Sequence, residues 1–250
     1  MKTADLLILQ HKKRFVIMTS AAKIKTIASK IGNLPTLPTI AARMIELADD
    51  PHTNIQTLAE LISTDQSLTA RILKSANSVY YGLAREISTV DTAIVVMGRN
   101  AVKEIGLSLS VIDAFKNIGS LNRFDIQKYW EHSVAVATEA MNIAKKQCPD
   151  KAGELYVAGL LHDIGKMILI QHVPNDFYSV LDYMEEKNVP YFEAEEEVLG
   201  ITHAEIGYII AERWNLPPNL CMTIRHHHSP DSAPKEFMTY AEIVCEANGI

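Results

Sequence analysis

The stretch AGLLHDIGKMIL, residues 158–169, places a histidine and an aspartate side by side inside an apolar run. Burying such a polar pair without hydrogen-bond partners would cost on the order of several kcal/mol. The pair therefore needs either hydrogen-bonding groups or a metal ion against it. Which of the two applies depends on where the other histidines of the chain lie.

The residues around this pair follow helical spacing. Leu155, Ala158, Gly159 and His162 fall at i, i+3, i+4 and i+7, which places His162 on the buried face of a helix predicted over 151–170. Asp163 lies about 100° further round the helix and can still reach the same pocket.

Helical patterns recur along the chain, with little strand signal, and predict an all-α fold. Thr53 or Asn54 caps the first of these helices and Asp65 caps the next. The acidic run at 192–200 is interpreted as a solvated helix end. After residue 125 the predicted helices cover roughly 126–146, 151–170, 174–187, 202–214 and 217–228, with a final helix opening near 236.

A polar break at 116–125 predicts two helical lobes. We expect a basic leader or helix over 1–22, an amino-terminal lobe over 23–115 and a carboxy-terminal lobe over 116–250. In the first lobe, an apolar stripe is expected to face the interior, and Asn77 is expected to be buried and bonded to backbone. The stripe consists of Leu68, Ile72, Leu73 and Ala76.

Composition narrows the class of protein. The 250 residues are 48% hydrophobic and 22% charged, as in a soluble globular protein. Three distant cysteines indicate no disulfide framework and fit the cytoplasm. No apolar run approaches the roughly 18 residues of a membrane span. The last predicted helix reaches the end of the chain, so the natural protein could extend past Ile250.

The charge is uneven along the chain. Residues 1–30 carry a net charge of +6 and the remainder −12, and an acidic body gives little support to nucleic-acid binding. The basic arm is interpreted as a solvated leader; the alternative is contact with an acidic partner or a membrane surface. Met18 is an alternative natural start.

Four predicted helices each turn one or two histidines inward. His203 shares a face with Trp214, helical spacing leads from Ile224 to His227 and His228, and His132 lies in the first turns of its helix. Neutral imidazoles with one carboxylate are the usual ligands of Zn, Mn or Fe. Asp163, with two oxygens, could bridge two ions. The alternative is a set of separate, hydrogen-bonded core histidines.

These motifs resemble a known family. HDIGK (162–166), with the flanking histidines, is similar to the HD superfamily of metal-dependent phosphohydrolases. LPTLPTI (34–40), STDQSLTARILKSANSVYYG (63–82), STVDTAIVVMG (88–98) and RWNLPPNL (213–220) resemble the HDOD domain, an HD-related output domain. The resemblance implies a two-lobed all-α fold and a cytoplasmic role in bacterial signal transduction.

The resemblance also implies a ligand set. It consists of His132, His162, Asp163, His203, His227 and His228, and His226 is excluded. Asn248 falls where the superfamily has a closing aspartate, and this neutral side chain should hold a cation more weakly. The GYP motif of the related cyclic-di-GMP phosphodiesterases does not follow the histidines, so that activity is not predicted.

Two functions remain open. The first is a signalling or scaffold module that binds protein partners and has an HD-like, metal-binding pocket. The alternative is a phosphohydrolase using Fe, Mn, Zn or Ni on a phosphate ester or nucleotide. In that case Asp163 would be catalytic and Lys166 would neutralise a phosphate oxygen of a small ligand. Lys166 could equally be a helix-end lysine favoured by the helix dipole.

Overall fold

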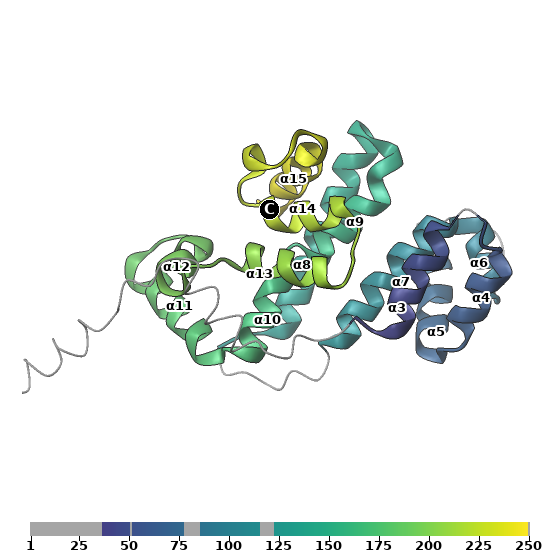
Figure 1. Ribbon diagram of the computed structural model, residues 1–250, viewed down its shortest axis with the longest axis horizontal. Helices are drawn as coiled ribbons and strands as arrows, with labels where there is room; N and C mark the ends of the chain where they lie inside the picture. Colours follow the sequence, from purple (N-terminus) through teal and green to yellow (C-terminus); the bar gives the residue numbers. More distant parts are fainter. Residues whose placement is uncertain (1–36, 51, 78–85, 116–122, 250) are drawn as a thin grey trace, which may run out of the picture. The chain divides into compact units, whose positions relative to one another are not determined.

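The structure is a computed structural model that describes residues 37–50, 52–77, 86–115 and 123–249 (Figure 1). Every regular element in these ranges is an α-helix or a short 3-10 helix, which confirms the all-α fold. The contacts divide the chain into two compact units. Unit 2 comprises the described residues of 34–167 and 204–250, and the described part of unit 1 is Ile168–His203. The predicted segment 1–22 lies outside the described residues.

The first lobe of unit 2 is a cluster of helices (Figure 1), and its buried apolar side chains form one core. Asn54 and Asp65 cap two of these helices, as predicted. The Asn54 side chain accepts from the Gln56 N–H, and the Asp65 side chain accepts from the Leu68 N–H. The lobe contains α3 (Thr39–Asp49), α4 (Ile55–Ser63), α5 (Gln66–Ala76), α6 (Val90–Met97) and α7 (Arg99–Ala114).

The predicted interior stripe of this lobe is confirmed for Leu68, Ile72 and Ala76, which are buried, whereas Leu73 is only partly buried. Asn77 bonds to backbone as predicted. Its amide donates to the Ile87 carbonyl and its carbonyl accepts from the Ile87 N–H, at 2.8 and 2.7 Å. The prediction that Asn77 is buried is wrong, because it follows the last turn of α5 and its side chain is exposed.

The second lobe of unit 2 is built on a close pair of helices, α8 and α9. A Cβ atom on Gly159 would lie 2.8 Å from the Cα atom of Ala137, so only glycine allows this approach. The lobe contains α8 (Ile126–Gln147), η2 (Pro149–Lys151), α9 (Ala152–Leu161), α14 (Pro218–His226), η3 (Pro230–Ser232) and α15 (Lys235–Asn248), with most of α13 (His203–Arg213). The boundary that we placed at 116–125 between the lobes stays a prediction.

The helix predicted over 151–170 is interrupted. α9 ends at Leu161 and α10 (Ile164–His172) begins three residues later, so His162 and Asp163 form the junction. An unbroken helix would separate these neighbouring side chains by about 100°. With the break, Nε2 of His162 lies 3.4 Å from Oδ2 of Asp163. Periodicity did not predict the junction, because the run contains no proline and stays apolar on both sides.

Unit 1 contains the end of α10, α11 (Pro174–Lys187) and α12 (Tyr191–Leu199). The prediction for α11 is confirmed residue for residue. The interpretation of the acidic run at 192–200 as a solvated helix end is wrong, because it forms most of α12 and buries Glu195 completely. Gly200 ends this helix with φ of 68°, a left-handed conformation that favours glycine. Among the described residues, no helix has the length and apolar character needed to cross a bilayer.

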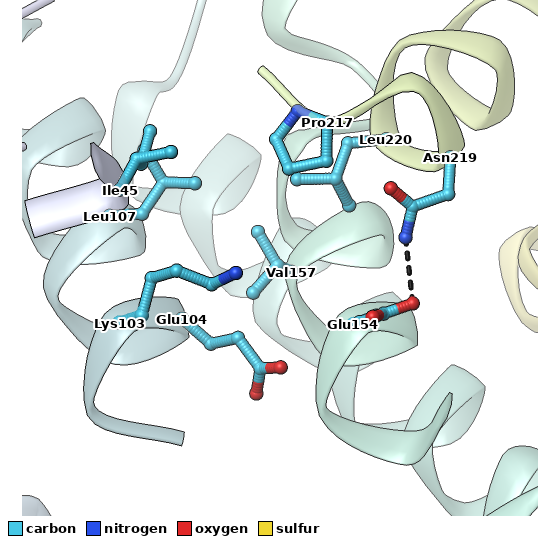
Figure 2. A pocket seen from close by; sticks show the side chains of 9 residues that line it. All are labelled: Ile45, Lys103, Glu104, Leu107, Glu154, Val157, Pro217, Asn219 and Leu220. Carbon is cyan, nitrogen blue, oxygen red and sulfur yellow. Dashed lines mark hydrogen bonds between the residues drawn. The ribbon is translucent and has the colours of Figure 1, made fainter. Parts of the chain in front are cut away.

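A small cavity of about 210 Å³ lies within unit 2, where α7 of the first lobe faces α9 (Figure 2). Two carboxylates reach it, from Glu104 on α7 and Glu154 on α9. The Asn219 amide donates to Glu154 at 2.7 Å. The cavity is lined by Ile45, Lys103, Glu104, Leu107, Glu154, Val157, Pro217, Asn219 and Leu220.

Candidate metal centre

Two histidines of unit 2 are held with the same ring nitrogen turned away from the pocket. Nδ1 of His162 lies 2.6 Å from the Gly159 carbonyl, and Nδ1 of His227 lies 2.8 Å from the Ile224 carbonyl. A carbonyl only accepts, so each Nδ1 carries the proton and, in the neutral ring, each Nε2 carries the lone pair. Both rings are fully buried.

The two Nε2 atoms converge on one carboxylate. Nε2 of His162 lies 3.4 Å from Oδ2 of Asp163, and Nε2 of His227 lies 3.7 Å from Oδ1. Nε2 of His162 is buried and has no hydrogen-bond partner in the part of the chain that the structure describes. Such a lone pair is costly in a protein interior unless something binds it. The donor set and this unsatisfied nitrogen therefore fit a divalent transition metal.

His132 approaches the same carboxylate from α8. Its Nε2 atom lies 4.0 Å from Oδ2 of Asp163, and its side chain is 39% exposed. Burial and the neighbouring His162 lower the pKa of His132, which favours the neutral, metal-binding ring. The Asn248 side chain hydrogen-bonds this ring. The residue in the closing position is thus beside His132, as the resemblance implied, but it contributes no charge.

His228 extends the cluster along α14. Its ring centroid lies 4.1 Å from that of His227, and it is half-buried. Within unit 2 the candidate ligand atoms form two groups, each spanning no more than 4.8 Å. One group contains His132, His162 and Asp163; the other contains Asp163, His227 and His228. Asp163 is common to both, as expected of a bridging carboxylate.

Lys166 lies one turn beyond the pair, at the start of α10. Its Nζ atom is 2.6 Å from Oδ2 of Asp163, and its side chain is 22% exposed. The ammonium group therefore already balances the charge of the carboxylate. A metal ion at Asp163 would compete with this ion pair.

Tyr129 is a neighbour that the sequence analysis did not identify. It is buried on α8, three residues before His132. Burial, and then the charge of Asp163, raise the pKa of its phenol well above the usual value. The phenol therefore stays neutral, and a tyrosine on an apolar helix face carries no sequence signal for such a place.

His203 lies in unit 1, at the first residue of α13, and is completely buried. Oε2 of Glu195 lies 2.5 Å from its Nδ1 atom and also accepts the His203 backbone N–H at 2.9 Å. Its role as a ligand stays a prediction. Glu195 is the second residue that sequence reasoning missed, because it lies in an acidic run that is typical of a solvated helix. His226, excluded from the ligand set, has its ring nitrogen 3.1 Å from the Ser232 hydroxyl instead.

The chain is similar to known proteins over most of its length. The model of the HDOD domain matches residues 34–230. The structure is similar to an HDOD domain protein of unknown function from Geobacter sulfurreducens, at 30% identity and a TM-score of 0.77, covering 90% of this chain and 78% of that one. It is also similar to a candidate phosphohydrolase from Shewanella amazonensis, at 25% identity and a TM-score of 0.75, with coverage of 90% and 79%.

A third similar structure is a candidate signal transduction protein from Marinobacter aquaeolei. The identity is 25% and the TM-score 0.71, over 93% of this chain but 55% of that one. The chain is also 26% identical, over 235 residues, to an uncharacterized protein of Treponema pallidum, and it spans only 45% of that relative's length.

Proposed function

The chain belongs to the HDOD domain family, and on that premise we propose that it is a bacterial, cytoplasmic signal-transduction module that binds protein partners and holds a divalent metal ion in its histidine cluster. Binding of the ion either holds helices together or makes the protein a metal sensor. It does not drive hydrolysis. The similarity to a candidate signal transduction protein supports the signalling role. The metal, which is Fe, Mn, Zn or Ni by donor type, is supported by the geometry of the ring nitrogens.

The observation that carries this proposal is the shortage of negative charge. In the two ligand groups of unit 2, Asp163 is the one carboxylate, and Lys166 lies 2.6 Å from it. Two divalent ions would bring four positive charges against one negative charge. At about 4 Å even two unit charges repel by about 4 kcal/mol in a protein environment. A pair of ions, as two-metal hydrolysis requires, is therefore disfavoured, whereas one ion can be accommodated.

The ligands fall into a stronger and a weaker set. Asp163, His227 and His228 form the stronger set, and His203 joins it as the sequence analysis predicted. His132 and His162 with Asp163 form the weaker set, because Asn248 gives it only a neutral amide. When bound, the ion would act as a Lewis acid. His162 and His227 orient their lone pairs through the Nδ1 hydrogen bonds, and their burial with Asp163 excludes water from these atoms.

A metal-dependent phosphohydrolase is the second candidate. The similarity to a candidate phosphohydrolase favours it, and so does the partly exposed Lys166 beside Asp163, which could bind a phosphate oxygen. In that case Asp163 and Lys166 would be the catalytic residues and the ligand a small phosphate ester or nucleotide.

The test combines metal content with turnover. Wild type, His162→Ala, His227→Ala and His226→Ala are purified without chelator, analysed for metals and melted. Each is then assayed against phosphate esters and cyclic nucleotides with added Mn, Fe, Ni or Mg. His226 is the matched control, since it adjoins the cluster but bonds to Ser232.

Under the proposal, His227→Ala loses the metal and His162→Ala loses about 2–5 kcal/mol of stability. His226→Ala resembles wild type, and no protein turns over substrate. Metal-dependent turnover in wild type that His162→Ala abolishes at an unchanged melting temperature would establish the phosphohydrolase instead. A wild-type protein that neither retains nor binds a transition metal would refute the metal site.

A further inference from the structure

One acidic side chain of unit 1 is buried with a histidine as its partner. Glu195, in the middle of α12, is completely inaccessible to solvent, whereas Glu196 and Glu197 beside it are exposed. Its Oε2 atom accepts two hydrogen bonds, from the backbone N–H and from the ring Nδ1 of His203, at 2.9 and 2.5 Å. Both bonds therefore go to one residue, eight positions further along the chain.

The second oxygen of this carboxylate is not satisfied. Oε1 of Glu195 is buried and has no hydrogen-bond partner among the described residues. A buried carboxyl group with one unsatisfied oxygen is a costly way to cap the start of α13, since a serine or asparagine cap would serve without burying an acid. We therefore expect the Glu195 side chain to have a role that needs an acidic group as well as a hydrogen-bond acceptor.

The partner of Nδ1 distinguishes His203 from the buried histidines of unit 2. His162 and His227 each place Nδ1 against a neutral backbone carbonyl, whereas His203 places it against a carboxylate. Either partner leaves the lone pair on Nε2, but a carboxylate also makes the ring a more basic ligand. The Tyr191 ring, with its centroid 5.8 Å from that of His203, packs on the same imidazole and limits its rotation.

We propose that Glu195 is a positioning residue that fixes the tautomer and orientation of His203 and supplies negative charge behind it, so that Nε2 is presented to a metal ion. This inference rests on the proposed function, because it takes His203 as one of the ligands.

Two variants of Glu195 separate hydrogen bonding from charge. Glu195→Gln keeps an oxygen that can accept from Nδ1 but removes the charge, and Glu195→Ala removes both. Glu196→Gln, a neighbouring exposed acid, is the matched control. The full chain is stripped of metal, and its Co²⁺ affinity is measured by competition with a chelator, with the Co²⁺ absorption spectrum reporting the ligand set. The ring protonation of His203 is read at pH 8 by ¹⁵N NMR of the metal-free protein.

We expect Glu195→Gln to keep the wild-type tautomer of His203 and to bind Co²⁺ about tenfold more weakly. In Glu195→Ala, both tautomers of His203 should be populated, and Co²⁺ affinity should fall by up to about a hundredfold. Glu196→Gln should match wild type. In a His203→Ala background, Glu195→Gln should cause no further loss of affinity, since the residue acts through that ring. A residue that only stabilises the fold would lower the melting temperature without moving the tautomer or the affinity of the folded protein.

The outcomes separate this inference from the proposed function. If wild type binds Co²⁺ and both Glu195 variants bind it with wild-type affinity and spectrum, the inference is overturned and the metal site stands. A metal-free wild type whose His203 carries its proton on Nε2 also overturns it. If wild type binds no Co²⁺ under any of these conditions, the proposed function and the inference fail together.

Discussion

Replacing Glu104 with glutamine should remove a pH dependence of stability that originates where α7 faces α9. The Glu104 carboxylate is partly buried in the cavity there and shares it with Glu154 (Figure 2). It is also packed directly on α9, because a Cβ atom added at Gly153 would lie 2.0 Å from its Oε2 atom. Burial first, and then the charge of Glu154, raise the pKa of Glu104 to about 7, against the opposing effect of Lys103.

The size and sign of the effect follow from this shift. An acid whose pKa rises from 4.5 unfolded to about 7 folded disfavours the folded state by about 3 kcal/mol once it is ionised. The folded state binds the extra proton, so this group imposes no penalty below pH 4.5. The penalty grows as the pH rises and is complete above pH 7. Glutamine mimics the protonated acid, so the Glu104→Gln protein should gain stability relative to wild type over this window.

The assay is urea unfolding of wild type and Glu104→Gln at half-unit steps from pH 4.5 to 8. The difference in unfolding free energy should grow by about 3 kcal/mol in favour of the variant. Glu60→Gln, at an exposed position on α4, is the control and should show no such trend. Glu154→Gln should shift the wild-type transition to lower pH, since it removes the like charge. A Glu104→Gln difference that stays constant within about 0.5 kcal/mol across this range would refute the reasoning.

Three further predictions concern single positions. Asn248→Asp should raise Co²⁺ affinity about tenfold or more, because a unit charge near a divalent ion contributes more than 1 kcal/mol even in solvent-like surroundings. Unchanged affinity in chelator competition would contradict the argument that the site lacks negative charge. Gly159→Ala should cost about 1–3 kcal/mol in urea unfolding, because the new methyl group meets the backbone of α8, whereas Gly249→Ala should be nearly neutral. Asn77→Ala should cost about 1–2 kcal/mol through the lost bonds to Ile87, and no change would mean that water replaces those bonds fully.

Local patterns were sufficient for most of the helices. Asn54 and Asp65 cap helices because their side chains reach N–H groups two or three residues ahead, which is a property of a few consecutive residues. The limits of α11 follow from Pro174 at its first residue and the periodicity behind it. Local sequence predicted only part of what the structure shows for Asn77. Its bonds to backbone were predictable from its side chain, but its exposure depends on which segments cover it.

For the candidate ligands, too, the sequence predicted burial but not the contacts around them. Helical spacing placed His162, His203 and His227 on buried faces, and all three are fully buried. Spacing did not reveal that the helix is interrupted at His162 and Asp163, or that Lys166 forms an ion pair with the Asp163 carboxylate. Both features depend on the space that the surrounding packed helices leave, and no short window of sequence contains that information.

What the sequence by itself determined was the class of fold, the order of helices and the burial of His162, His203 and His227, since periodicity and capping act between residues a few positions apart. Only the tertiary structure decided which polar groups face one another. Glu195 is one of three consecutive glutamates and is indistinguishable from the others in sequence, yet it alone of the three is fully buried and holds His203. Glu104 and Glu154 are 50 positions apart, and their shared cavity exists because α7 packs on α9. Burial and electrostatic coupling are properties of distances in space, and those distances are set by packing between helices remote in the chain.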